Sequence, residues 1–187
     1  TKVDSAQNVL IKKVATQGMK HRKTIVLQAH LDMVHQKNNS SSFDFDTQGI
    51  AMQISNGWVH ARETTLGADN GIGVAAIMSI LASNDSAHPS IEALFTVDEE
   101  TGMTGAMGLE PDYLKGEILL NLDTEDDDEI SIGCAGGVDI TATGVYEEES
   151  TPNESMAFQI SVNGLQGGHS GMDIHKGLGN ANKIMNR

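Results

Sequence analysis

Three short apolar segments place the strongest limit on the fold of this chain. Residues 24–29 (TIVLQA), 91–97 (IEALFTV) and 117–122 (EILLNL) have the length of strands and are flanked by polar or charged residues, which predicts three buried strands. Between the first two, residues 71–83 (GIGVAAIMSILAS) carry apolar side chains at helical spacing. The alternation of strand, helix and strand predicts an α/β fold, in which crossover helices connect the strands of one sheet.

A small hairpin is predicted inside the first connection. Residues 52–54 and 58–60 have strand character, and Asn56-Gly57 stands between them. This dipeptide suits the positive φ angles that a tight two-residue turn requires.

The pattern changes after Gly136-Gly137. Residues 138–146 (VDITATGVY) and 157–162 (AFQISV) alternate in strand fashion, and a helix is predicted to begin near Leu178. We therefore expect a first domain in residues 1–136 and the opening of a second α/β domain in residues 137–187. Two strands and part of one helix are too little to close a sheet and core.

The charge balance excludes several classes of function. The chain has 26 acidic and 12 basic residues, for a formal net charge of −14, and two acidic runs (125–129 and 147–149) that we interpret as solvated surface. This balance argues against binding to nucleic acid or to anionic membranes. No apolar run is long enough to span a bilayer. Cys134 is the sole cysteine, so no internal disulfide can form, and we expect a cytoplasmic protein.

Polar residues with metal-ligand chemistry follow each predicted strand. His30 and Asp32 follow the first, Glu99 and Glu100 the second, and Asp123 the third. In open α/β sheets, ligands bind outside the carboxyl ends of the strands. Taken singly, the His-x-Asp pair could be a chance arrangement and the glutamates a solvated acidic turn.

Asp69 adds a further carboxylate in a loop that precedes the predicted helix. Gly67 and Gly71 flank it and allow a tight backbone turn. An N-terminal helix cap is the competing interpretation for this aspartate. Taken together, one histidine and several carboxylates at one sheet edge form the O/N set that catalytic divalent cations favour. Two such cations 3.5–4 Å apart need a bridging carboxylate.

The motifs HLD, GADNG, DEETG and NLDTED, in this order, resemble those of the co-catalytic dizinc peptidases, the family of aminoacylase, carnosinase and peptidase T. Further segments, among them VLQAHLDMV, TTLGADNGIG and GGHSGMDIHKGLGNANK, are similar to the aminoacyl-histidine dipeptidases within it. The resemblance runs from about residue 24 to the last residues. It implies a zinc-peptidase-like sheet with crossover helices, followed by the start of an α/β lid or dimerisation domain.

The resemblance also implies a set of metal ligands. His30 would bind one zinc ion, Asp69 would bridge two, Glu100 would bind the second and Asp123 the first. The two divalent ions are expected to be zinc, with manganese or cobalt as possible replacements. A cis peptide bond is expected between Asp69 and Asn70.

Two more residues receive catalytic roles from the resemblance. Asp32 would orient His30, and Glu99 would act as the general base for a metal-activated water. His169, in the segment 167–171 (GGHSG), resembles a lid histidine that reaches the active site across a homodimer to hold substrate. An ordinary turn histidine is the alternative for His169.

The expected activity is metal-dependent hydrolysis of small peptides, in particular Xaa-His dipeptides. A related aminoacylase or tripeptide aminopeptidase activity is the alternative on the same site. The family also uses a fifth ligand, a histidine near the end of the full chain, which no residue here matches. We therefore expect a metal-binding fragment, without the N-terminal helix and C-terminal segment of the catalytic domain, that is inactive by itself.

Overall fold

The computed structural model describes residues 1–124, 128–134, 136–138, 140–169 and 171–187. It separates into two compact units, unit 1 (Thr1–Asp127) and unit 2 (Asp128–Arg187). The predicted division at residue 136 into a catalytic domain and the beginning of a lid stays a prediction.

Unit 1 is built on one five-stranded mixed sheet with the strand order β1-β2-β6-β3-β7. β3 pairs in parallel with both β6 and β7, whereas β2 is antiparallel to β6 and to β1. The strands are β1 (Lys2–Val3), β2 (Val9–Lys13), β3 (Ile25–His30), β6 (Ile91–Thr96) and β7 (Ile118–Asn121). The predicted α/β class is therefore correct, and all three predicted strands are present.

The register of the parallel strands decides where the functional side chains lie. His30 pairs with Thr96, and Gln28 pairs with Asn121, so β3, β6 and β7 end close together at one edge of the sheet. Residues that follow these strands must leave the sheet at that shared edge. Asp32, Glu99, Glu100 and Asp123 follow these strands and His30 ends one of them, whereas Asp69 comes from the start of α1.

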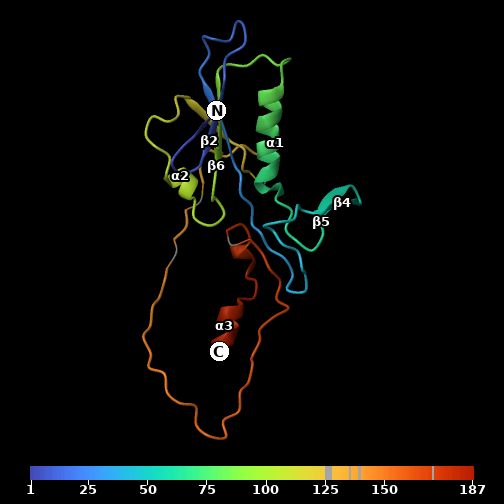
Figure 1. Cartoon of the computed structure of the whole chain (residues 1–187), viewed down its shortest axis with the longest axis vertical. Helices are drawn as coiled ribbons and strands as arrows, with labels where there is room; N and C mark the ends of the chain where they lie inside the picture. The colour runs from blue at the N-terminus through green and yellow to red at the C-terminus, as the bar shows by residue number, and fades with distance from the viewer. Residues whose placement is uncertain (125–127, 135, 139, 170) are drawn as a thin grey trace. The chain divides into compact units, whose positions relative to one another are not determined.

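The helix α1 (Ala68–Ala82) packs on one face of the sheet (Figure 1). It belongs to the crossover connection that joins the parallel strands β3 and β6. Ile77 is completely buried against Leu27, Ala29 and Phe95, and this contact forms the centre of the core. The prediction of a helix over residues 71–83 is thus nearly correct. The residues before it, Asp69 and Asn70, have non-helical backbone angles.

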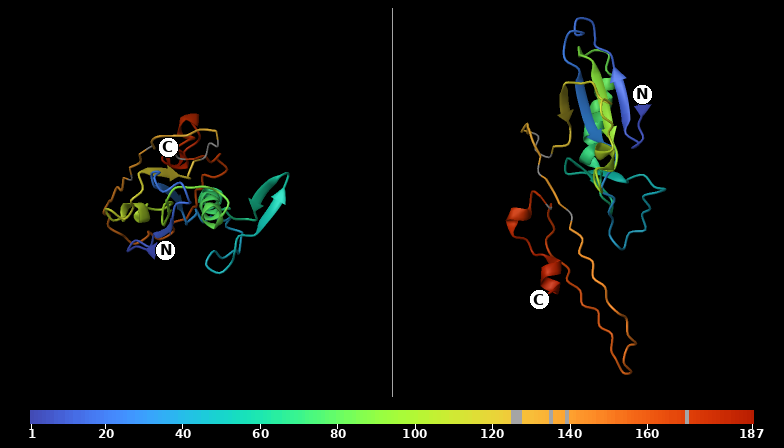
Figure 2. Two further views of the ribbon diagram at one scale, coloured as in Figure 1. Left: turned by 90° about the horizontal axis from the view of Figure 1, so that it is seen from above. Right: turned by 90° about the vertical axis from the view of Figure 1, so that its left-hand side faces the viewer.

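The short helix α2 (Thr104–Met107) lies on the opposite side of the sheet from α1, as both views show (Figures 1 and 2). It is tied to the sheet by the buried Asn8, whose Nδ2 donates to the carbonyl of Gly105 at 2.8 Å. The strand β2 was not among the predicted strands, although Val9, Leu10 and Ile11 form an apolar run. None of the described helices is long and apolar enough to cross a membrane.

One strand differs from expectation in its burial. β7 was predicted to be buried, but Leu119 is 56% exposed and Leu120 is 47% exposed. The reason is its position at the edge of the sheet, where it pairs only with β3. The predicted hairpin is present as β4 (Met52–Ser55) and β5 (Trp58–Ala61). Asn56 and Gly57 have φ values of 52° and 81°, as the turn requires.

Unit 2 corrects the prediction of two strands. Over the described residues of 138–146 and 157–162 no strand forms, and the apolar side chains are exposed, including Ile140 at 86% and Phe158 at 79%. Alternation supplies one apolar face, but a strand also needs a neighbour for its backbone hydrogen bonds. The described part of unit 2 holds a 3-10 turn (Ile174–Lys176) and α3 (Ala181–Met185). α3 starts slightly later than predicted, because the side chain of Asn180 caps it by accepting from Lys183 N at 2.9 Å.

Candidate metal centre

His30 is the last residue of β3, and its ring is buried with 1% of its side chain exposed. Its Nδ1 donates to the carbonyl oxygen of Asp32 at 3.0 Å and lies 3.4 Å from that residue's Oδ1. The other ring nitrogen, Nε2, faces Asp69 Oδ1 at 3.0 Å and Asp123 Oδ1 at 3.8 Å. Because Nδ1 donates to Asp32, Nε2 is the nitrogen that can bind a cation.

Burial lowers the pKa of His30, but the hydrogen bond to Asp69 and the charges of Asp123 and Asp32 outweigh it and raise this pKa above its ordinary value. Positive charge is therefore favoured at this ring. Because a proton and a metal ion compete for the same nitrogen, a site that attracts one also attracts the other.

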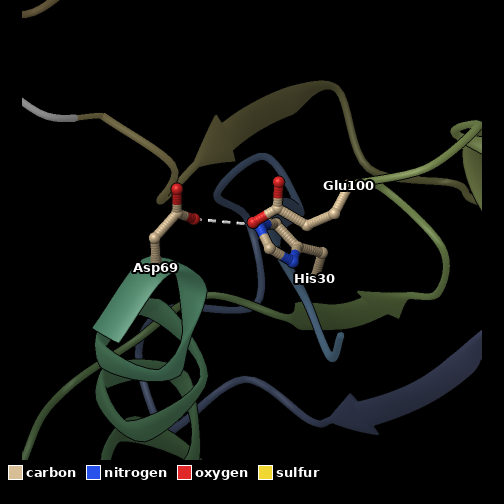
Figure 3. A group of neighbouring side chains, drawn as sticks. All are labelled: His30, Asp69 and Glu100. Atoms are coloured by element: carbon tan, nitrogen blue, oxygen red, sulfur yellow. Dashed lines mark hydrogen bonds and ion pairs between the residues drawn. The ribbon is translucent and has the colours of Figure 1, made fainter. Parts of the chain in front are cut away.

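Asp69 lies in the first turn of α1 and points toward His30 and Glu100 (Figure 3). Gly67 directs it there: its φ is 77°, and a Cβ on this residue would lie 2.7 Å from Met33 Sδ. The N-cap interpretation of Asp69 is not supported, because the residue before the helix is Gly67 and no side chain caps it. The bond between Asp69 and Asn70 is cis, as the resemblance implied.

Glu99 and Glu100 lie in the loop that follows β6. Asp32 holds this loop, since its two carboxylate oxygens accept the backbone N–H groups of Glu99 and Glu100, each at 3.1 Å. Burial raises the pKa of Asp32, but these two amides and the charge of His30 outweigh burial and lower it. One ionised carboxylate thus links the end of β3 to the loop after β6.

Two overlapping groups of metal-ligand atoms result, and they share His30. In one, His30 joins Asp69 and Glu100; in the other, it joins Glu99 and Asp123. Within each group the ligand atoms lie within 4.8 Å of one another. The two adjacent glutamates therefore join different groups.

The electrostatics of this cluster favour bound cations. Burial raises the pKa of Glu99, Glu100 and Asp123, and the negative charge of Asp69 raises each further. Over the part of the chain that the structure describes, no Lys or Arg forms an ion pair with these residues. Neighbouring carboxylates repel unless positive charge lies between them. One imidazole nitrogen and several carboxylate oxygens at these separations fit one or two divalent metal ions.

A cavity of about 210 Å³ opens beside the cluster on the sheet face opposite α1. Glu99 and Asp123 form part of its wall, and most of the remainder is apolar, including Leu94, Leu119 and Met103. The cluster thus has a water-accessible side and an apolar side.

The sequence-predicted residues divide into two sets. The structure brings together six of them, which are His30, Asp32, Asp69, Glu99, Glu100 and Asp123. His169 belongs to unit 2, where its Nδ1 accepts the backbone N–H groups of Gly171 at 3.0 Å and Met172 at 3.1 Å. This contact is that of a turn histidine, and its proposed contact with substrate stays a prediction.

Sequence reasoning missed one residue of the cluster. Asn70 Nδ2 donates a hydrogen bond to Asp123 Oδ1 at 2.6 Å, although 53 positions separate the two residues. Its place directly after Asp69 was the sole available signal, and nothing in the sequence relates it to Asp123.

Comparison with known proteins gives a consistent result. The model of peptidase family M20/M25/M40 matches residues 26–170. The chain is 50% identical to the cytosol non-specific dipeptidase of Escherichia coli K12 over 184 residues, which cover 98% of this chain and 38% of that protein.

Two solved structures are also similar. The aminoacylhistidine dipeptidase of Vibrio alginolyticus matches with a TM-score of 0.71 and 47% identity over 98% of this chain and 38% of that one. The aminopeptidase PepT of Bacillus cereus matches with a TM-score of 0.52 and 27% identity over 64% of this chain and 30% of that one. The chain thus spans about 38% of the length of the first two relatives.

Proposed function

The chain belongs to peptidase family M20/M25/M40, and from this premise we propose that it forms the metal-binding part of a dipeptidase that hydrolyses Xaa-His dipeptides. One observation carries the proposal. His30 and the carboxylates of Asp69, Glu100, Glu99 and Asp123, which come from distant parts of the sequence, meet at one edge of the sheet without a Lys or Arg ion pair among the described residues.

The resemblance assigns the roles of the ligands, and the closeness of their side chains supports this assignment. His30 Nε2 and Asp123 would hold one cation, Glu100 would hold the other, and Asp69 would bridge both. Zinc is the ion we propose, with manganese or cobalt as replacements, because each accepts this O/N set. When bound, such ions lower the pKa of water and polarise a peptide carbonyl.

Glu99 is the proposed general base. Burial raises its pKa, and among the nearby charges His30 lowers it whereas Asp123 and Glu100 raise it. A carboxylate with a raised pKa can take a proton from the attacking water and deliver it to the leaving amine. Bound cations would lower this pKa again, which keeps Glu99 ionised at the start of the reaction.

Asp32 is proposed to orient two parts of the site at once. It fixes the ring of His30, and it fixes the backbone of Glu99 and Glu100. Loss of this carboxylate would therefore disturb a metal ligand and the base together.

The remaining assignments rest on the resemblance and on the names of the relatives. We propose that the complete enzyme is a cytoplasmic homodimer that dimerises through its lid, and that His169 contacts substrate there. The similarity to the aminopeptidase PepT keeps tripeptide aminopeptidase activity as a second candidate. A panel of Xaa-His dipeptides, other dipeptides, tripeptides and N-acyl amino acids would separate the candidates.

The test uses this chain and a chimera. In the chimera, the chain replaces the matching 184 residues of the E. coli dipeptidase. The rest of that dipeptidase remains and supplies the part of the enzyme that this chain does not cover. We expect hydrolysis of Xaa-His dipeptides that a chelator abolishes and Zn²⁺ restores. Glu99→Gln should reduce kcat about 10²–10⁴-fold with the metal content retained. The exposed Glu110 offers a matched control, Glu110→Gln, with normal turnover.

Normal turnover in a folded Glu99→Gln chimera, or hydrolysis that ignores the chelator, would contradict the proposal. If the chimera does not fold, the metal content of the 187-residue chain, measured by mass spectrometry, tests whether the cluster binds metal. We expect bound Zn²⁺ that His30→Ala removes.

A further inference from the structure

Asn70 is an uncharged side chain buried at the metal centre, with 3% of its surface exposed. It lies in the first turn of α1, directly after Asp69. Its Nδ2 donates to the backbone carbonyl of Leu122 at 2.9 Å and to Asp123 Oδ1 at 2.6 Å. A carbonyl and a carboxylate oxygen can only accept, so the amide nitrogen, and not its oxygen, must face them.

The oxygen of this amide group, Asn70 Oδ1, is by contrast buried and has no hydrogen-bond partner among the residues that the structure describes. A buried acceptor without a partner costs about 1–3 kcal/mol. Stability alone gives a poor reason for an asparagine here, because a smaller apolar side chain would avoid this cost. The reason lies instead with the donor end, which faces the cluster.

The helix provides the space that this side chain occupies. Gly73 is buried, and a Cβ on it would lie 2.1 Å from Asn70 Oδ1 and 2.7 Å from the carbonyl oxygen of Leu122. Gly71, two residues earlier in the same helix, has nothing within 4 Å of the corresponding position. A side chain at position 73, but not at position 71, would therefore displace Asn70 from Asp123.

Asp123 is held from its other side by the sheet. Its backbone N–H donates to Asn121 Oδ1 at 2.8 Å, and Asn121 Nδ2 donates to Gln28 Oε1 at 2.5 Å. Gln28 Nε2 in turn donates to Thr96 Oγ1 at 3.1 Å. This row of polar groups crosses β7, β3 and β6 and fixes the backbone of Asp123. The carboxylate itself is fixed by Asn70, which comes from the helix.

We propose that Asn70 is a positioning residue of the metal centre: its side-chain amide, seated in the space left by Gly73, holds Asp123 Oδ1 on the side of His30. The residue after one proposed ligand, Asp69, thereby fixes another ligand 53 positions further along the chain from it. The separation of the two ligands is set by a two-residue segment of backbone and one hydrogen bond. This inference rests on the proposed function, since it takes Asp123 to be a ligand.

The test measures Zn²⁺ and Co²⁺ affinity of the 187-residue chain in a chelator-buffered titration. We expect Asn70→Ala to raise the dissociation constant of the more weakly bound ion about 10–100-fold, as the loss of a ligand's supporting contact does in metal sites. Gly73→Ala should act in the same direction, and Gly71→Ala should match the wild type. The visible absorption of bound Co²⁺ should change in Asn70→Ala, because the carboxylate is no longer fixed.

Leu27→Ala serves as the control for a purely structural effect, because it weakens the core without touching the cluster. It should lower thermal stability and leave the Co²⁺ spectrum unchanged. Wild-type affinity and spectrum in Asn70→Ala would overturn the proposal even if Gly73→Ala does not fold. A wild-type chain that binds neither ion would instead refute the proposed function itself, and this inference with it.

Discussion

Unit 1 and unit 2 carry similar strand patterns in their sequences but reach different degrees of order. In unit 1, β3 and β6 pair along six positions and bury Leu27, Ala29 and Phe95 beneath α1. In unit 2, the described residues of 138–146 and 157–162 alternate in strand fashion, yet they form no strand, and no described residue of unit 2 is buried.

The difference shows what a functional site of this kind requires. Every proposed metal ligand follows or adjoins an element of the packed sheet and helix of unit 1, so the ligands are fixed before a cation arrives. His169 lies in a local turn of unit 2, where its backbone N–H donates to Asp173 and its ring accepts the N–H of Gly171. Pre-organised ligands lower the cost of binding, whereas a residue in a local turn has to be positioned by something else.

The largest expected effect comes from the core of unit 1. Ile77→Ala removes a fully buried side chain from the contact between α1 and the sheet. We expect a loss of about 2–5 kcal/mol in the free energy of unfolding, measured by urea titration. A loss below about 1 kcal/mol would mean that the core of unit 1 is no better packed than unit 2.

Metal addition should sharpen the contrast between the units. Zn²⁺ at about 100 times its dissociation constant should stabilise the folded state by about 2.7 kcal/mol, because it binds only the folded cluster. Hydrogen exchange should slow in β3 and β6 and stay fast in residues 140–162. His30→Ala is the control and should remove the effect. Equal protection of both segments would contradict the assignment of the site to unit 1.

A third prediction concerns Glu92, which lies on the sheet face opposite α1. It is 3% exposed, and its carboxylate accepts from Lys12 Nζ at 2.5 Å and from the backbone N–H groups of Lys115 and Gly116 at 2.7 and 2.8 Å. Glu92→Ala would leave these donors without their partner, so we expect a loss of about 1–3 kcal/mol at pH 7. The measurement is again the urea midpoint.

The same residue predicts a pH dependence. Burial raises the pKa of Glu92, but Lys12 and the two amides outweigh burial and hold it below its usual value. A carboxyl group with a depressed pKa in the folded state stabilises the fold above its unfolded pKa of about 4.3, and this stability is lost as the pH falls through the folded pKa. Glu92→Gln should therefore flatten the acid side of the stability profile. A profile as steep as that of the wild type would place the responsible group elsewhere.

The smallest effect is expected in unit 2. Ile140→Ser alters a side chain that is 86% exposed, so the free energy of unfolding should change by no more than about 0.5 kcal/mol. A loss comparable to that of Ile77→Ala would show that residue 140 is buried in solution, and the contrast between the units would not hold.

Much of the fold and of the site is determined by the sequence alone. The apolar runs define β3, β6 and β7, the helical spacing defines α1, and Asn56-Gly57 defines the hairpin turn, because each depends on neighbours within a few positions. The order of the motifs identified the six residues that meet at the sheet edge. Most of them lie at or after the ends of parallel strands, and parallel strands end at the same edge of a sheet.

Only the tertiary structure decided the rest. Strand pairing determines burial, so β7 is exposed at an edge, and the described residues of 138–146 form no strand despite a suitable pattern. The contact of Asn70 with Asp123 and the two amides on Asp32 likewise join residues more than fifty positions apart. Local chemistry makes such residues available as ligands and supports, but the packing of α1 against the sheet determines which of them meet.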